Sequence, residues 1–121
     1  MVEKLLDDSA GIILDLKYHH NRPRPGQLAE KYNIKLAEVI LSSMKTPSYP
    51  SGHSTQGYLI GHYLSEKFDN PKLANEFMSE AKAISKSRNI ARAHYPSDSK
   101  LGEELGKKMF RYIKNDVERK L

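Results

Sequence analysis

The chain has 121 residues, of which 29% are charged and 38% are hydrophobic, and its formal net charge at pH 7 is +5. These values are typical of one soluble globular domain, and they exclude two independently folded domains. The sequence contains no cysteine, which excludes both a disulfide framework and a metal site built from thiolates.

Apolar residues recur three and four positions apart along most of the chain, which is the spacing of amphipathic helices that pack on one core. The pattern predicts helices over residues 2–18, 26–44, 53–68, 71–92 and 96–120. Their apolar stripes include Leu5, Ile12, Ile13, Tyr32, Leu59, Phe68 and Ile84. No segment alternates apolar and polar residues between turn signals, so we expect no strands. The predicted fold is an all-α, single-domain bundle of about five helices that spans residues 1–121.

The N-terminal region has no pattern of a targeting or membrane-spanning segment. It mixes acidic and apolar residues, and the apolar run over residues 10–14 is too short for a secretory signal. No stretch of the chain approaches the roughly 18 apolar residues that a membrane span requires. We therefore expect a cytoplasmic protein without a membrane span.

The positive net charge alone would fit a protein that binds nucleic acid. The basic residues are dispersed, however, and the late cluster alternates with acidic side chains. This cluster consists of Lys107, Lys108, Arg111 and Lys114. Such a pattern favours a solvated helix face over a nucleic-acid-binding stripe, although a positive field can still speed the capture of anionic substrates. We do not expect nucleic acid as a partner.

Three short motifs bring together cationic, imidazole and carboxylate side chains. The first is a lysine, six further residues and Arg-Pro; the second is Pro-Ser-Gly-His; the third is Ser-Arg, five residues, His, three residues and Asp. Their positions are Lys17 with Arg24-Pro25, Pro50-Ser51-Gly52-His53, and Ser87-Arg88 with His94 and Asp98.

The motifs fall at the ends of predicted helices. Lys17 lies at the end of the first helix, and Arg24 lies in the loop after it, where flanking prolines restrict φ. Gly52 directly precedes a helix, so the nearby backbone N–H groups can point at an anion. Pro96 suits the first position of the last helix and places Asp98 in its first turn, where the helix dipole favours a carboxylate. We expect the bundle to gather these ends into one pocket, which makes them the candidate active site.

The three motifs resemble the signature of the type 2 phosphatidic acid phosphatase superfamily, which includes the class A non-specific acid phosphatases and the vanadium-dependent haloperoxidases. Every specified position agrees, and the resemblance extends from Lys17 to Asp98, about two thirds of the chain. A second Arg-Pro pair, Arg22-Pro23, also follows Lys17, but the six-residue spacing selects Arg24. The sequence around the second and third motifs is closest to the soluble acid phosphatases. The resemblance implies a helical core and the hydrolysis of phosphomonoesters.

The residue types suit the binding of a phosphate monoester, whose charge of nearly −2 is spread over its non-bridging oxygens. Catalysis on such a group is mainly positioning and electrostatic stabilisation. Lys17, Arg24 and Arg88 are the candidate cations, since arginine can hold paired oxygens and lysine acts as a point charge. Ser51 and the Gly52 N–H are expected to complete the phosphate-binding cradle.

The two histidines and the aspartate suit covalent catalysis. His94 is the candidate nucleophile, with Asp98 accepting a hydrogen bond from its other ring nitrogen. His53 is the candidate general acid, which protonates the leaving alkoxide and then activates water against the phosphohistidine. The family resemblance implies the same roles for the histidines of the second and third motifs.

A metal cluster made from the histidines is disfavoured. The conceivable ligands are His19, His20, His53, His94 and Asp98. They lack helically spaced pairs such as H-E-x-x-H, and three nearby cations would repel a divalent ion. We therefore expect neither a metal nor a cofactor, although phosphate or vanadate would suit the same pocket.

Two alternatives to a phosphatase remain open from the sequence. A vanadium-dependent haloperoxidase uses the same pocket for vanadate, but members of that branch are much larger and enclose the cofactor. A non-catalytic module that binds phosphate or nucleic acid would need only the cations, whereas both histidines and Asp98 are present. Soluble relatives usually have additional helices before the first motif. A homo-oligomer is therefore favoured over a monomer, and a small phosphorylated substrate is the expected ligand.

Overall fold

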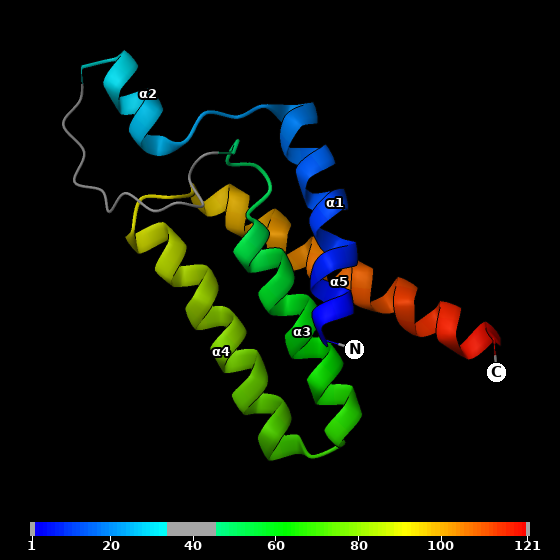
Figure 1. The fold of residues 1–121 in the computed structure, drawn as a ribbon. Coiled ribbons are helices and arrows are strands. Elements are labelled where there is room, and N and C mark those ends of the chain that lie inside the picture. Colours follow the sequence, from blue (N-terminus) through cyan, green and yellow to red (C-terminus); the bar gives the residue numbers. More distant parts are fainter. Residues whose placement is uncertain (1, 34–45, 121) are drawn as a thin grey trace.

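The computed structural model describes residues 2–33 and 46–120, and within these ranges the chain is all-α, without a strand (Figure 1). Its helices are α1 (Val2–His20), α2 (Pro25–Lys31), α3 (Gly52–Phe68), α4 (Pro71–Ile90) and α5 (Pro96–Lys120). None of these helices is long and apolar enough to cross a lipid bilayer. The predicted fold class, an all-α helical bundle, is confirmed.

The second predicted helix differs from the observed one. Helix α2 ends at Lys31, and Tyr32 and Asn33 form a turn in which Asn33 has a φ of 57°. Asparagine tolerates this left-handed conformation better than most residues, so it commonly ends a helix. The expected continuation of the helix through these two residues is therefore wrong. The remainder of that predicted helix, residues 34–44, lies outside the described residues.

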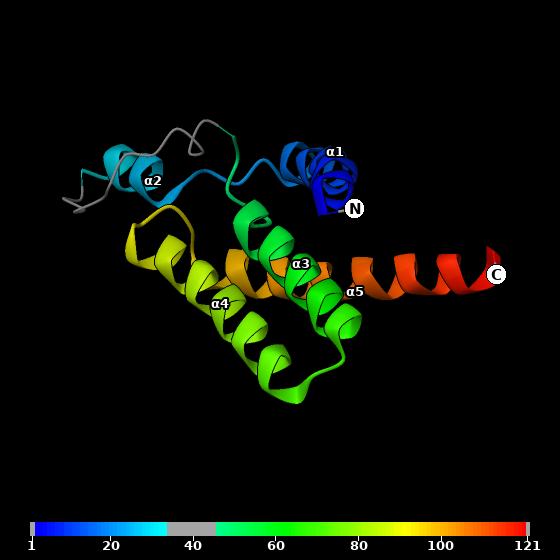
Figure 2. The same ribbon diagram turned by 60° about the horizontal axis from the view of Figure 1, so that its bottom comes forward.

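Helix α3 is the centre of the fold and packs against α1, α4 and α5. Helices α3 and α4 form an antiparallel hairpin, while α5 crosses α3 and extends beyond it (Figures 1 and 2). In the hairpin connection the Asn70 side chain caps α4 by accepting the backbone N–H groups of Lys72 and Leu73. The C-terminal ends of α1 and α4 and the N-terminal ends of α3 and α5 lie at one end of the bundle (Figure 1).

Two glycines on α5 allow its close approach to α3. A Cβ atom at Gly102 would lie 2.7 Å from the Ser51 carbonyl oxygen. One turn further along α5, a Cβ atom at Gly106 would clash with the Thr55 carbonyl oxygen. The Ser51 N–H donates to the Asp98 carbonyl oxygen over 3.1 Å, so the same contact ties the start of α5 to the start of α3. The backbones of the second and third motifs therefore touch.

The interior between the helices is rich in small polar side chains. Ser54 Oγ and Ser85 Oγ are 2.7 Å apart, and Ser85 Oγ donates to Glu103 Oε1 over 3.0 Å, which links α3, α4 and α5. Buried apolar side chains among the described residues include Leu5, Ile13, Leu59, Ala81 and Ala93. Other members of the predicted apolar stripes are exposed, namely Ile12, Tyr32, Phe68 and Ile84. For these four residues the expectation of burial in one core is wrong.

Candidate active site

The end of the bundle contains a cavity of about 300 Å³, and six of the eight predicted site residues line it. These six are Lys17, Arg24, Gly52, His53, Arg88 and His94. They come from α1, the N-cap of α2, α3, α4 and the connection between α4 and α5. The other two, Ser51 and Asp98, are fully buried behind the cavity wall. The fold thus brings all three motifs to one place, with both imidazoles facing the same cavity.

Lys17 is a buried cation in the last turn of α1. Its side chain is only 4% exposed, and its Nζ donates to the Pro47 carbonyl oxygen over 2.7 Å. Burial, reinforced by the positive charge of Arg24, lowers the pKa of Lys17 to about 8. Most of the lysine is protonated at neutral pH, and an anion in the cavity would stabilise that charged form further.

Arg24 is the N-cap residue of α2, and its guanidinium extends into the bundle. Its Nε donates to the Thr46 carbonyl oxygen over 2.9 Å and its Nη1 to the Ala93 carbonyl oxygen over 3.0 Å. The same Nη1 lies 3.0 Å from Nε2 of His94. Burial and the charge of Arg88 lower the pKa of Arg24 to about 10, so the guanidinium remains a cation at neutral pH. A guanidinium can only donate hydrogen bonds, and Nε2 must therefore accept and carry no proton.

His94, just before α5, and Asp98, in the first turn of α5, form a buried hydrogen-bonded pair. Nδ1 of His94 lies 3.4 Å from Oδ2 of Asp98, which also accepts the Tyr95 N–H over 2.9 Å. Burial lowers the pKa of His94, with Arg24 and Lys17 acting in the same direction and Asp98 opposing them. Burial alone would raise the pKa of Asp98, but these hydrogen bonds and Arg22 hold it below its usual value. The favoured state is thus a neutral imidazole, with its proton on Nδ1, beside an ionised carboxylate.

His53 lies in the first turn of α3 at the edge of the cavity. Partial burial lowers its pKa, and the nearby Arg88, His94, Lys17 and Arg24 lower it further. Burial and these positive charges therefore favour a neutral His53. A general acid must carry a proton, so this predicted role requires a negatively charged ligand that offsets the surrounding positive charge.

Ser51 and Gly52 differ in their relation to the cavity. Ser51 is the N-cap residue of α3, and its Oγ accepts the Ser54 N–H over 3.2 Å. Its hydroxyl is thus engaged by the helix and does not line the cavity. Gly52 lines the cavity, and a Cβ atom there would lie 3.5 Å from Ile13 Cγ2, an ordinary contact. The packing of the protein therefore leaves room for a Cβ atom at this position, and glycine keeps the backbone accessible from the cavity.

Arg22, which the motif spacing had set aside, is part of the site. Its Nη1 donates to Oδ1 of Asp98 over 2.7 Å and to Ser97 Oγ over 2.8 Å. Its guanidinium carbon lies 4.1 Å from the centre of the Tyr49 ring. The repeated Arg-Pro pair is the sequence signal for this residue, since it places a second arginine beside Arg24.

The remaining histidines lie apart from the cavity. His62 stacks on Phe110 with 5.8 Å between the ring centres, and the rings of His19 and His20 pack edge to face. None of the three lines the cavity that contains His53. In the part of the chain that the structure describes, no group of three or more histidine, aspartate or glutamate side chains is arranged to hold a metal ion.

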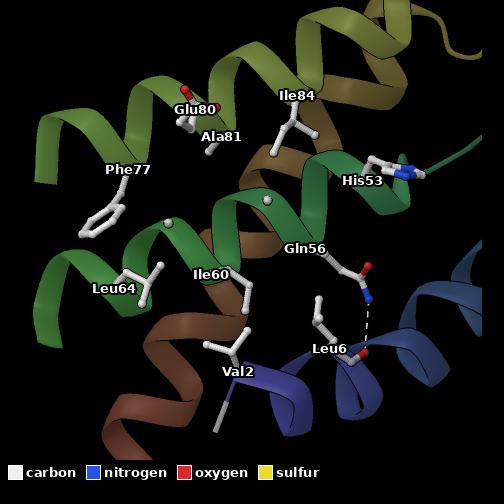
Figure 3. A pocket seen from close by; sticks show the side chains of 12 residues that line it. Val2, Leu6, His53, Gln56, Ile60, Leu64, Phe77, Glu80, Ala81 and Ile84 are labelled. Carbon is white, nitrogen blue, oxygen red and sulfur yellow. Dashed lines mark hydrogen bonds between the residues drawn. The ribbon is translucent and has the colours of Figure 1, made fainter. Parts of the chain in front are cut away.

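A second, mainly apolar cleft of about 350 Å³ adjoins the charged cavity between α1, α3 and α4 (Figure 3). His53 and Gln56 line both spaces. The Gln56 amide donates to the Leu6 carbonyl oxygen over 3.1 Å and so ties α3 to α1 where the two spaces meet. Ile60 and Ile84 contribute to the apolar wall. The site as a whole therefore has a cationic end and an apolar end, with His53 between them.

Comparisons of this chain with protein-family models, with curated proteins and with solved structures find no match. The resemblance to the type 2 phosphatidic acid phosphatase superfamily therefore remains a prediction based on the three motifs.

Proposed function

We propose that the chain is a metal-independent phosphatase that hydrolyses small phosphomonoesters through a phosphohistidine intermediate at His94. One observation carries the proposal. Three cationic side chains line one cavity beside a histidine whose Nε2 carries no proton, and no carboxylate is among the described residues that line it. The cations are Lys17, Arg24 and Arg88.

The clustered cations favour a doubly charged ligand. Burial is the main cause of the lowered pKa values of Lys17 and Arg24, and the positive charge of a neighbour, Arg24 for Lys17 and Arg88 for Arg24, lowers each pKa further. Like charges in a partly dry cavity repel each other more strongly than they would in water. A phosphate dianion removes this repulsion and offers several oxygens to the donors, including the N–H groups at the start of α3.

The first chemical step transfers the phosphoryl group to the enzyme. Nε2 of His94 attacks phosphorus, and the bond from phosphorus to the ester oxygen breaks. The Arg24 N–H that caps Nε2 turns to a phosphoryl oxygen, while Asp98 stabilises the positive charge that develops on the imidazole. Protonated His53 donates its proton to the departing alkoxide, so an alcohol leaves.

The second step returns the enzyme to its starting state. Neutral His53 takes a proton from water, and the resulting hydroxide attacks phosphorus. The bond between Nε2 of His94 and phosphorus breaks, inorganic phosphate leaves, and His53 is again protonated. The sum is the hydrolysis of an ester to an alcohol and phosphate. Every proton is accounted for by the two histidines and water.

The test is phosphate release from a panel of phosphomonoesters, measured with EDTA present. We expect turnover by the wild type, none by His94→Ala, and an acid-labile phosphoryl adduct on the wild type alone. Equal phosphate release by the two proteins would refute the proposal. Phosphate binding without hydrolysis would instead support a binding module, and halide oxidation with vanadate and peroxide would support a haloperoxidase.

A further inference from the structure

We propose that Arg22 is a positioning residue that acts through Asp98 to keep His94 neutral and correctly oriented for attack. The inference builds on the proposed role of His94 as the nucleophile. It concerns one of the six unspecified residues between Lys17 and Arg24 in the first motif, and it follows from how the hydrogen bonds of Asp98 are divided between its two oxygens.

The two oxygens of the Asp98 carboxylate have different partners. Oδ1 accepts the Arg22 Nη1 at 2.7 Å, whereas Oδ2 accepts the Tyr95 N–H at 2.9 Å and faces Nδ1 of His94 at 3.4 Å. The side chain of Asp98 is fully buried, so its charge needs a close counter-charge. Arg22 supplies it at the shorter distance. The histidine therefore need not become an imidazolium to balance the carboxylate.

Arg22 is itself fixed by contacts on several sides. Its Nη1 also donates to Ser97 Oγ, and its guanidinium lies over the Tyr49 ring. Its backbone carbonyl oxygen accepts the Ser48 N–H over 2.9 Å. These contacts connect the segment before α2 with the start of α5. Held in this way, the guanidinium fixes the plane of the Asp98 carboxylate and, through Oδ2, the direction of the imidazole ring.

Among the described residues that line the cavity, the other charged side chains around His94 are positive. They are Lys17 on α1, Arg24 at the start of α2, His53 when protonated on α3, and Arg88 on α4. Asp98 on α5 is the opposing charge. Loss of Arg22 would leave this buried carboxylate with His94 as its remaining ionisable hydrogen-bond donor. The protonated imidazole would then be favoured, and protonation of Nε2 removes the lone pair that attacks phosphorus.

The experiment compares Arg22→Gln, Arg22→Lys and the wild type, with Arg111→Gln as a matched control. Arg111 is an exposed arginine on α5, so its replacement removes the same charge away from the site. NMR titration of the His94 ring reports its protonation without requiring catalysis. We expect the His94 midpoint to rise by about one pH unit in Arg22→Gln, and to stay unchanged in Arg22→Lys and in the control.

Activity gives a second readout that a merely structural role would not move. An upward shift of one pH unit lowers kcat/KM about tenfold on the acid side of the profile and little above it. An unchanged or lowered His94 midpoint in folded Arg22→Gln would overturn the proposal. If Arg22→Gln fails to fold, the test rests on Arg22→Lys. This variant keeps the positive charge beside Asp98, so a shifted His94 midpoint in it would contradict the proposed role of that charge. If the His94 midpoint rises in Arg22→Gln but the wild type releases no phosphate, the proposed function is refuted and the effect of Arg22 on His94 is still supported.

Discussion

The contact between α3 and α5 can be tested by adding one methyl group. In Gly102→Ala the new Cβ atom would lie 2.7 Å from the Ser51 carbonyl oxygen and 2.8 Å from Ser54 Cβ. Ordinary van der Waals spacing requires the helices to separate by roughly half an ångström. The Ser51 N–H bond to the Asp98 carbonyl oxygen resists this separation, since it joins the same two helix starts.

The magnitude follows from two opposing terms. Crowding of a packed interface costs about 1–3 kcal/mol, while alanine is favoured over glycine within a helix by about 1 kcal/mol. The difference is a loss of about 0–2 kcal/mol in the free energy of unfolding. We expect Gly102→Ala to lie near the upper end, about 2 kcal/mol, because the crowded atoms are backbone and Cβ atoms that cannot rotate away. Gly11 provides the matched control, since a Cβ atom there would have no described atom within 4 Å. Gly11→Ala should raise the free energy of unfolding by about 0.5–1 kcal/mol.

The assay is urea unfolding of the two variants and the wild type, followed by circular dichroism, with the slopes compared for changes in the unfolded state. Opposite signs for the two substitutions are the expected result. Equal stabilisation by both would refute the close packing of α5 on α3, because Gly102→Ala would then report helix propensity alone. Phosphate release by Gly102→Ala should also fall, since the start of α5 carries Asp98.

Three further predictions concern the two ends of the site. Burial and the neighbouring cations lower the pKa of His53 below its ordinary value of 6.5, so kcat/KM should begin to fall at a pH below that value. The bound dianion should move the fall in kcat to a higher pH, and coincident limbs in the two profiles would contradict this. Lys17→Met should raise the free energy of unfolding at pH 7 by on the order of 1 kcal/mol. The same substitution should abolish the rise in Tm that added phosphate is expected to cause in the wild type, and calorimetry measures both effects. The substitution is expected to stabilise the protein because burial lowers the pKa of Lys17 from 10.5 to about 8, which means that the charged form is less stable in the folded chain than in the unfolded chain. Between these two pKa values the unfolded chain binds one more proton than the folded chain. The stability of the wild type should therefore rise with pH in that range. Ile60→Asn should raise KM for an alkyl phosphate roughly fivefold and leave KM for glycerol phosphate unchanged, because Ile60 lines the apolar cleft beside His53. Equal effects on both substrates would count against the binding of an apolar leaving group in that cleft.

Local signals in the sequence predicted the helix ends that carry the site. Pro96 begins α5 and puts Asp98 in its first turn, as expected from its fixed φ and missing N–H. The spacing of the motifs also identified six residues that line one cavity. These successes share a cause, since each depends on the chemistry of a residue and its near neighbours in the chain.

The features that the sequence did not predict are long-range. The ion pair between Arg22 and Asp98 joins residues 76 positions apart, and motif spacing alone favours Arg24 over Arg22. The close crossing at Gly102 depends on how α5 meets α3, which helical periodicity does not describe. Ser51 has the residue type of a phosphate ligand, but the same hydroxyl is also a good N-cap, and in the structure it caps α3 by accepting the Ser54 N–H.

The fold keeps positive charge available in the cavity by the way it satisfies its polar groups. Lys17 and Arg24 donate to backbone carbonyl oxygens, which orient their side chains without cancelling their charge. Asp98 lies behind His94 and is paired with Arg22 on its far oxygen. A carboxylate that faced the cavity would neutralise the cations and compete with a phosphate group. Separating the anion from the cations in this way costs stability, because the buried cations repel one another. A ligand with two negative charges, as the proposed function requires, would relieve that repulsion.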